Sequence, residues 1–390
     1  MKHKWKAGAA AALLMVTMLL PLPVAAQGLE QGRFELPQFD VPCKTAILID
    51  QDSGTVLYEK QADAQVPIAS ITKVMTMLLA MEALEQGRVQ LTDIVPVSEH
   101  AYSMGGSQIW LEPGEQLTLD EMMRAICVSS ANDAAVAVAE FLAGSEQAFV
   151  EAMNQKAQEL GMTSTTFRNA CGLDEPGHLS TARDVARMSR EILTKHPKIM
   201  EYTGIWMDSL RQGQTQLINT NKLLKRYEGI TGLKTGTTGG AGVCLTASAT
   251  RNGLSLIAVV LGSPSSGERF TAATTLLDYG FANYENHPLS LPSEAPQTIA
   301  VEQGSQETVA LTYQMPGGVL LRQGETADLE VKVELEPSVQ APVEQGQQLG
   351  TVTVWCGQQQ LGQWPVTAAQ EVPRLDLRLA LNRLLAGLLQ

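Results

Sequence analysis

The sequence predicts two folded domains, the larger an α/β (α+β) sandwich and the smaller all-β, followed by a short amphipathic tail. Three observations support this prediction. The 390 residues are enough for about two domains of ordinary size. Within residues 30–287, strand-like segments come first, helical patterns follow and strand-like segments return, which is typical of a sheet assembled from distant parts of the chain. Beyond a proline-containing linker at 287–296, alternating apolar and polar residues over 297–370 indicate short strands.

The first 26 residues are expected to be a secretory signal peptide. Lys2, Lys4 and Lys6 make the start positive, an apolar run follows to residue 22, and the small residues at 24–26 form a cleavage signal. The alternative is an uncleaved membrane anchor. Removing residues 1–26 takes away three lysines and no acidic residue, so the net charge changes from −13 to −16.

The first half of the larger domain is expected to open with a hairpin and continue with helices. Residues 45–50 contain four consecutive apolar residues, a turn ending in glycine follows, and 55–58 returns as a second strand. Gly87 ends the first helical pattern, and Thr118 with Glu121 has the spacing of a capping box that opens the second. The expected helices are 70–86, 118–128, 133–142 and 146–160.

The second half is expected to complete the sheet. Residues 242–249 and 254–261 run apolar and alternate like adjacent strands, and 271–281 has the pattern of a helix packed on them. The smaller domain, 297–370, contains no cluster of reactive side chains, so we expect it to be a spacer or an interaction module.

Residues 373–390 form a leucine-rich tail that carries Arg374, Arg378 and Arg383. On a helical wheel four leucines fall together: Leu377, Leu381, Leu384 and Leu388. We interpret the tail as a membrane anchor, a helix lying in the membrane plane with its arginines toward lipid headgroups. The alternative is a helix docked on its own protein or on a dimer partner.

Composition excludes several classes of function. With 28 basic and 41 acidic side chains, an acidic surface would repel phosphate backbones, so no nucleic-acid partner is expected. The five histidines are scattered and no paired-cysteine spacing occurs, so neither a metal nor another cofactor is expected. The five cysteines are widely spaced and odd in number, which leaves at least one thiol unpaired and excludes a disulfide scaffold.

Ser70 and Lys73 stand where the first long helical pattern begins. Positions three apart share one helix face, so the Lys73 amine can approach the Ser70 hydroxyl. A serine becomes nucleophilic when a base removes its proton, and a lysine can be that base if burial or another cation lowers its pKa. Alone this pair is a weak signal, because a serine helix cap followed by a solvated lysine looks the same.

Ser130 and Asn132 lie between two helical segments. A second hydroxyl at Ser130 can relay a proton, and the Asn132 amide can hold a substrate carbonyl or amide. Asn132, or Asp133 after it, can equally be a helix cap. Both readings can hold together, since a cap fixes a loop residue rigidly.

Lys234, Thr235 and Gly236 precede the expected strand at 242–249. Lys234 supplies a positive charge that attracts a carboxylate and can lower the pKa of Lys73. Thr235 can donate its hydroxyl to the same carboxylate, and Gly236 keeps the approach of an extended peptide open.

The order of these three motifs, with Ser130 60 residues after Ser70 and Lys234 104 residues after Ser130, makes coincidence remote. The chain resembles the serine D-Ala-D-Ala carboxypeptidases, the low-molecular-mass penicillin-binding proteins, over essentially the whole mature sequence. Three further segments resemble the same family: 101–114, 166–174 and 232–238. The resemblance implies the β-lactamase/penicillin-binding-protein-like transpeptidase fold, with the small β domain and the tail as the family's second domain and membrane anchor.

The resemblance also implies a catalytic role for each matching residue. Ser70 would attack the carbonyl between the two D-alanines of a peptidoglycan stem pentapeptide, and Lys73 would be its general base. Ser130 would pass the proton to the departing D-alanine, and Asn132 would orient the substrate. Water would then release the acyl-enzyme, and β-lactam antibiotics would acylate Ser70 as inhibitors.

Substrate binding would involve the strand that carries Lys234. Lys234 and Thr235 would hold the terminal carboxylate, with Gly236 beside them, and Arg269 would add positive charge. The backbone N–H groups of Ser70 and Thr237 would form the oxyanion hole. Some family members carry histidine where this chain has Thr237, a departure that can alter turnover or pH dependence.

Two rival functions remain open at this stage. A class A β-lactamase shares the three motifs, but it needs a glutamate for deacylation, and residues 161–174 contain none. A catalytically silent wall-binding or sensor protein would keep the motifs only to bind ligand. A transpeptidase or endopeptidase with the same nucleophile is a closer cousin. The expected location is outside the cytoplasm, peripheral on the outer face of the cytoplasmic membrane.

Overall fold

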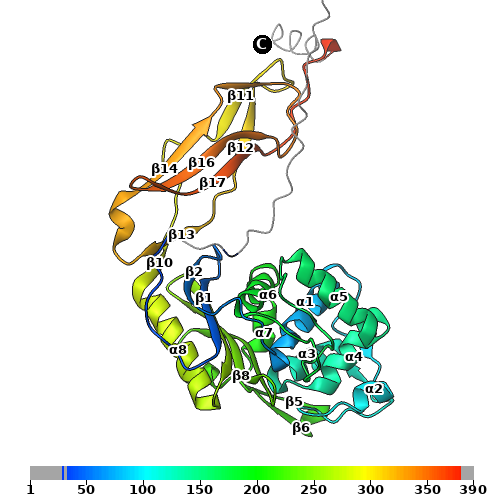
Figure 1. The fold of residues 1–390 in the computed structure, drawn as a ribbon. Coiled ribbons are helices and arrows are strands. Elements are labelled where there is room, and N and C mark those ends of the chain that lie inside the picture. The colour runs from blue at the N-terminus through cyan, green and yellow to red at the C-terminus, as the bar shows by residue number, and fades with distance from the viewer. Residues whose placement is uncertain (1–28, 30–32, 379–390) are drawn as a thin grey trace, which may run out of the picture.

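The computed structural model describes residue 29 and residues 33–378 (Figure 1). The predicted signal peptide and the part of the predicted tail from residue 379 lie outside the described residues, so both stay predictions. The described chain forms a larger domain of mixed helices and strands, followed by an elongated all-β domain (Figure 1). This confirms the predicted fold class.

The larger domain is built on a five-stranded antiparallel sheet in the order β2-β1-β9-β8-β7. Its strands are β1 (Thr45–Asp50), β2 (Val56–Lys60), β7 (Ile230–Thr238), β8 (Gly242–Arg251) and β9 (Leu254–Ser263). The four strands predicted here are confirmed to within two residues at each end. Lys234, Thr235 and Gly236 lie inside β7, which is an edge strand of the sheet.

Every residue of β1 is buried, because the sheet is covered on both faces. Ile47 and Ile49 belong to one core, whereas Ala46 and Leu48 belong to the core against α8 (Ser266–Asn283). Successive side chains of a strand point to opposite faces, so a continuous apolar run serves both cores. Figure 1 shows α8 on one side of the sheet and the remaining helices of this domain on the other.

The helices opposite α8 are α1 (Lys73–Glu85), α2 (Glu99–Tyr102), α3 (Leu119–Arg124), α4 (Asn132–Ala143), α5 (Glu146–Glu159), α6 (Ala182–Lys195) and α7 (Ile199–Thr203). The predicted capping box is present: the Thr118 hydroxyl accepts from the Glu121 N–H, and the Glu121 carboxylate accepts from the Thr118 N–H. The helix predicted at 271–281 is confirmed as the central part of α8.

Two predicted helices differ from the structure. The helix expected from residue 70 begins as a 3₁₀ turn, Ala69–Thr72, and becomes a regular α-helix only at Lys73. The helix expected at 118–128 leaves α-helical geometry after Arg124 and continues as a π-helix over Ala125–Ser129. Such π segments are frequent at functional sites. Both departures lie beside candidate catalytic serines.

The smaller domain is a six-stranded sheet in the order β14-β16-β17-β12-β11-β15. Its strands are β11 (Thr298–Glu302), β12 (Thr308–Tyr313), β14 (Leu329–Leu335), β15 (Ser338–Gln340), β16 (Gln348–Cys356) and β17 (Gln359–Ala368). Where the linker was expected to begin, β10 (Tyr284–Pro288) pairs with β13 (Gly318–Arg322) and joins the two domains.

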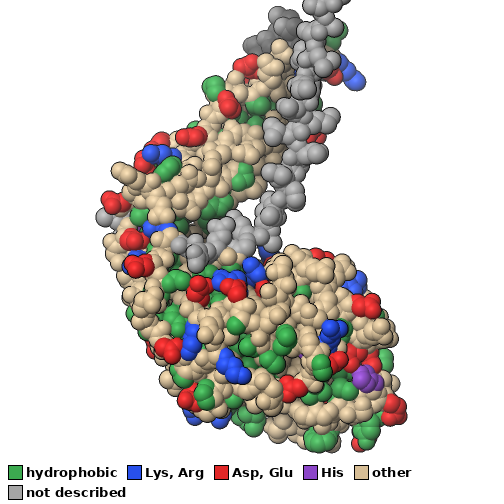
Figure 2. All heavy atoms as spheres, in the orientation of Figure 1, with side chains coloured by type: hydrophobic (Ala, Val, Ile, Leu, Met, Phe, Trp, Pro, Cys, Tyr) green, Lys and Arg blue, Asp and Glu red, His purple; other side chains and the backbone are tan. Residues whose placement is uncertain are grey.

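Figure 2 shows acidic and basic side chains interspersed over the face it presents. None of the helices in the described ranges is long and apolar enough to cross a membrane.

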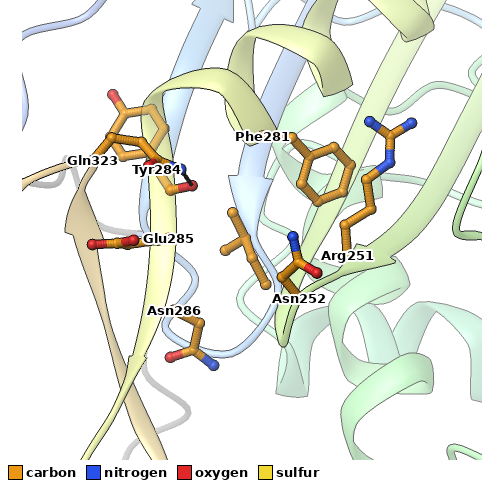
Figure 3. Close-up of a pocket in the computed structure, with 8 residues that line it drawn as sticks. Arg251, Asn252, Phe281, Tyr284, Glu285, Asn286 and Gln323 are labelled. Carbon is orange, nitrogen blue, oxygen red and sulfur yellow. Dashed lines mark hydrogen bonds between the residues drawn. The ribbon is translucent and has the colours of Figure 1, made fainter.

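At the domain junction, a hollow of about 430 Å³ lies between the β8–β9 turn and β10 (Figure 3). Arg251, Phe281 and Glu285 line it, and none of the candidate catalytic residues does.

Candidate active site

Ser70 lies in the 3₁₀ turn that leads into α1, where this turn meets the edge strand β7. The strand comes so close that a Cβ at Gly236 would lie 3.0 Å from the backbone N of Ser70 and 3.0 Å from the Cβ of Ala69. Glycine at 236 therefore lets β7 pass directly beside the turn that carries Ser70.

Lys73 is completely buried at the first turn of α1. Its Nζ donates to the Ser70 Oγ at 3.0 Å, the Asn132 Oδ1 at 2.6 Å and the Cys171 carbonyl at 2.7 Å. None of these acceptors is a carboxylate, so none carries a negative charge that would offset the free-energy cost of burying the protonated Lys73 amine. Burial lowers the pKa of Lys73 to about 8. A lysine with that pKa can accept a proton from Ser70 near neutral pH.

Ser130 follows the π-helix at the end of α3 and has a left-handed backbone, with φ 61° and ψ 31°. A non-glycine residue in this region is strained, and such strain is common at functional sites. Its Oγ accepts a hydrogen bond from the Lys234 Nζ at 2.8 Å. The left-handed residue thus turns the chain so that a buried hydroxyl faces the cation on β7.

Asn132 begins α4 and connects Lys73 to the loop at 105–111. Its Oδ1 accepts from Lys73, its Nδ2 donates to the Gly105 carbonyl at 2.7 Å, and its backbone N–H donates to the Ser107 carbonyl at 2.7 Å. The alternative that Asn132 or Asp133 caps this helix is wrong, because the N-cap residue of α4 is Ala131 and the helix has no side-chain N-cap hydrogen bond. Asn132 instead uses its Oδ1 to hold the base and one Nδ2 hydrogen bond to hold the loop.

Lys234 is also fully buried, and its Nζ bonds to the Ser130 Oγ and to the Thr235 carbonyl. Burial, followed by the charges of Lys73 and Arg269, holds the pKa of Lys234 well below its usual value. The adjacent Thr235 hydroxyl lies 2.6 Å from that of Thr220. A buried cation without a carboxylate partner suits an anionic ligand group.

Arg269 projects from α8 and bonds to the backbone of the sheet on the face that α8 covers. Its Nη1 donates to the carbonyls of Gly236 and Cys244, at 3.3 and 3.1 Å, and its Nη2 donates to the Ser266 hydroxyl. Burial lowers the pKa of Arg269 to about 10. The structure therefore places Arg269 on the backbone of β7 and β8, from where its charge also acts on Lys234.

Thr237 is the exposed residue that follows Gly236 on β7. Its hydroxyl donates to the Gly236 carbonyl at 2.7 Å. An edge strand leaves alternate backbone N–H groups unpaired, so β7 can offer donors to an extended ligand.

The segment 169–178 was known from the sequence only as part of a resembling block, and its contribution to the site was missed. Besides the Cys171 carbonyl on Lys73, the Ala170 carbonyl accepts from the Thr76 hydroxyl at 2.6 Å. Gly172 has φ +86°, and a Cβ there would lie 2.0 Å from the Ala69 carbonyl oxygen. The segment is therefore pressed against the turn that carries Ser70.

Two side chains, one in the middle of this segment and one at its end, fasten it to its neighbours. Asp174 accepts from the Thr238 hydroxyl at 2.6 Å and from the Gly240 N–H at 2.9 Å, which ties it to the β7–β8 turn. His178 is buried, its Nδ1 accepts from the Arg168 N–H, and its Nε2 therefore donates to the Thr72 hydroxyl at 2.8 Å. Burial lowers the pKa of His178 to about 4, so this imidazole is neutral near pH 7. No role was predicted for His178 from the sequence, because that role is visible only through long-range contacts.

The structure thus brings the predicted residues together in two hydrogen-bonded groups. Ser70, Lys73 and Asn132 form one, and Ser130 with Lys234 forms the other. In the described part of the chain, no cluster of three or more metal-ligating side chains occurs. A nucleophilic hydroxyl, a lysine base with lowered pKa, a second hydroxyl and a buried cation suit acyl transfer through a serine ester.

Comparisons with known proteins point to one family. A family model described as D-alanyl-D-alanine carboxypeptidase matches residues 33–265, and one described as penicillin-binding protein 5, C-terminal domain, matches 284–374. D-alanyl-D-alanine carboxypeptidase DacF from Bacillus subtilis is 42% identical over 375 residues, covering 95% of this chain and 96% of that protein. DacC from Escherichia coli is 34% identical, with coverage of 94% and 91%.

Solved structures agree. Penicillin-binding protein 5 from Haemophilus influenzae has a TM-score of 0.74 at 30% identity, covering 87% of this chain and 99% of that one. Penicillin-binding protein D2 from Listeria monocytogenes, in its cefotaxime-bound form, has a TM-score of 0.58 at 31% identity. It covers 63% of this chain and 99% of that one.

Proposed function

Because the chain belongs to the D-alanyl-D-alanine carboxypeptidase family, we propose that Ser70 is the nucleophile with which this serine carboxypeptidase removes a terminal D-alanine from peptidoglycan stems. The observation that carries the assignment is the Lys73 amine, which is buried, bears a lowered pKa and lies 3.0 Å from the Ser70 Oγ. Ser70 attacks the carbonyl between the two D-alanines, its proton passes to Lys73, and an Oγ–C bond forms.

Collapse of the tetrahedral intermediate breaks the C–N bond to the terminal D-alanine. The departing amine needs a proton, and Ser130 supplies it. Its position on Lys234 supports this role, because a hydroxyl bonded to a buried amine can be reprotonated as it gives its proton away. Water then hydrolyses the ester and releases the shortened stem.

The substrate carboxylate binds to Lys234 and Thr235. A negatively charged group beside Lys234 restores the partner that this buried cation lacks, which raises its pKa and strengthens the contact. Backbone N–H groups of Ser70 and Thr237 receive the oxyanion, while Gly236 keeps the strand close to Ser70. Asn132 orients the substrate amide, and Arg269 supports β7 from the other side.

β-Lactams acylate the same serine, since they present a strained amide and a carboxylate in a similar arrangement. Penicillin-binding protein D2 from Listeria monocytogenes has been solved with cefotaxime and with ampicillin, which supports this expectation. The class A β-lactamase alternative remains the rival to be tested. A long-lived benzylpenicillin adduct supports the carboxypeptidase, and rapid turnover would support a lactamase.

We also propose that the protein is exported and held at the outer face of the cytoplasmic membrane by its tail. Leu375 and Leu377, near the end of the described residues, are 37% and 88% exposed, which supports an apolar surface at this end of the chain. A protein ending at Val372 should lose its sedimentation with anionic lipid vesicles. If it sediments as strongly as the full chain, the tail is not the anchor.

Release of D-alanine from a tripeptide ending Lys-D-Ala-D-Ala tests the proposed reaction. The mature protein should release D-alanine and Ser70→Ala should not. No release by a folded wild-type protein that still binds penicillin at Ser70 reversibly, without an adduct, would support the silent binding protein instead.

A further inference from the structure

Trp110 is the most exposed large apolar side chain in the described part of the larger domain, with 74% of its surface open to solvent. Its backbone is left-handed, with φ +58°. Bulky residues rarely adopt this region, since the Cβ crowds the backbone. The exposed indole buries little apolar surface, and the residue keeps a strained backbone conformation. Neither feature stabilises the fold.

The strained conformation is imposed from two sides. The buried Asp133 carboxylate accepts hydrogen bonds from the N–H groups of Ile109 and Leu111, each at 3.1 Å, on both sides of Trp110. Arg211 donates to the carbonyl of Ile109 at 2.7 Å and to that of Trp110 at 3.3 Å. Retained strain of this kind is typical of ligand-binding positions.

The loop that carries Trp110 is attached to the active site. The Gly105 and Ser107 carbonyls both accept from Asn132, the residue whose side chain also holds Lys73. Trp110 lies three residues beyond Ser107, and three residues of extended chain span at most about 10 Å. The indole is therefore near Asn132 without belonging to the catalytic hydrogen-bond network.

We propose that Trp110 binds the glycan part of the substrate by stacking its indole on a sugar ring. This inference rests on the proposed function. In a stem pentapeptide three residues precede the two D-alanines, so the sugar that carries the stem lies about 10 Å or more from the scissile bond. A residue up to about 10 Å of chain beyond the part of the loop bonded to Asn132 can therefore contact a sugar at that distance.

The chemistry around the indole favours a neutral sugar over the stem peptide's carboxylates. Arg211, the cation bonded to this loop, is already paired with Glu115 and with two carbonyls. The apolar C–H face of a pyranose ring fits a flat aromatic surface. Beside it, the Ser107 and Gln108 side chains make no hydrogen bonds with the described residues, so they are available to sugar hydroxyls.

Two substrates with the same scissile bond test the inference: a short tripeptide ending Lys-D-Ala-D-Ala, and a disaccharide carrying the full pentapeptide. Trp110→Ala should lower kcat/KM for the disaccharide pentapeptide by about fivefold to tenfold, the loss of one aromatic contact. Its kcat/KM for the tripeptide should stay within about twofold of wild type. Trp110→Phe should restore most of the loss. Ile94→Ala, which removes another exposed apolar side chain of this domain, should change neither substrate.

Equal loss on both substrates would overturn the inference and make Trp110 a positioning residue for the loop. No loss on either would overturn it as well. A wild-type protein that cuts neither substrate would refute the proposed function itself, which is a distinct result.

Stability provides an independent readout. Trp110→Gly removes the steric strain at φ +58°, so its thermal midpoint should equal or exceed that of wild type while the disaccharide preference disappears. A clear fall in the midpoint would mean that the indole stabilises the fold, which contradicts a binding role for it.

Discussion

The Nζ of Lys234 donates to the Oγ of Ser130 at 2.8 Å, although 104 residues separate them in the chain. Lys73 holds Ser70 in the same way at 3.0 Å. Both amines are buried and bond only to neutral acceptors in the described structure. The site therefore presents two lysines with lowered pKa values, one placed to take a proton and the other to receive an anion.

Acylation of Ser70 should accelerate with pH and reach a plateau near pH 8. Burial lowers the pKa of Lys73 to about 8, and the base acts only when it is neutral. Well below that pKa the rate should rise about tenfold per pH unit. The measurement is the second-order rate of benzylpenicillin acylation between about pH 6 and about pH 9.5. A flat profile would show that Lys73 is not the base.

Lys234→Gln should act mainly on recognition of the terminal carboxylate. Wild type should strongly prefer a substrate ending in D-Ala-D-Ala acid over the same peptide with a terminal amide. The variant should lose about 10²-fold in kcat/KM for the acid and little for the amide, since a charged hydrogen bond is lost. Lys222→Gln, at an exposed lysine, is the matched control. Equal losses on acid and amide would contradict the assignment.

Stability should fall on acidification partly because of His178. Burial lowers the pKa of this imidazole to about 4, whereas an unfolded histidine titrates near 6.5. Between these values the unfolded chain binds the proton that the native state refuses, so the free energy of unfolding falls as the pH falls. The full effect is about 3 kcal/mol below pH 4.

Urea unfolding at about pH 7 and about pH 4.5 measures this dependence. His178→Gln cannot titrate and can still bond to Thr72, so its pH dependence should be smaller than that of wild type. His287→Gln, in β10, is the control for the loss of a histidine elsewhere in the chain. If His178→Gln and wild type lose the same stability on acidification, the imidazole is not the group responsible.

Gly172→Ala and Gly87→Ala should differ sharply in their cost. Both glycines have positive φ, but a Cβ at Gly172 would lie 2.0 Å from the Ala69 carbonyl, while one at Gly87 would meet nothing within 4 Å. Gly87→Ala should therefore cost about 1 kcal/mol of unfolding free energy, from its backbone conformation alone.

Gly172→Ala should cost more than about 3 kcal/mol and should also slow acylation, because the turn that carries Ser70 must shift. Chemical denaturation and the benzylpenicillin rate measure the two effects. Similar costs at both glycines would mean that the segment 169–178 does not press on this turn.

The sequence could predict contacts that are local or that depend on side-chain type. Ser70 and Lys73 are three residues apart, so helix geometry alone brings them together. The hydrogen bond between Ser130 and Lys234 was not predicted, because it depends on the fold; the family resemblance implied only a separate role for each residue. The hydrogen bonds that Thr76 and Lys73 donate to the backbone carbonyls of Ala170 and Cys171 could not be predicted. Every residue type carries a backbone carbonyl, so the sequence does not mark these two.

Of two other features that were not predicted, one had a readable signal and one did not. Helix α6 was missed, although Thr181 caps it by accepting from the Asp184 N–H, and its buried residues recur at helical spacing. The π-helix before Ser130 had none, because no residue type in Ala125–Ser129 distinguishes a π-helix from an α-helix. Arg269 was expected beside the substrate, and the structure adds a role that only contacts reveal: it holds the carbonyls of Gly236 and Cys244.

The most direct test of the account is intact-mass analysis of the mature protein after reaction with benzylpenicillin, followed by peptide mapping of the adduct. The account predicts one penicilloyl group per protein on Ser70, and none on Ser70→Ala. An adduct on another residue, or no adduct on a folded wild-type protein, would contradict the assignment of Ser70 as the nucleophile.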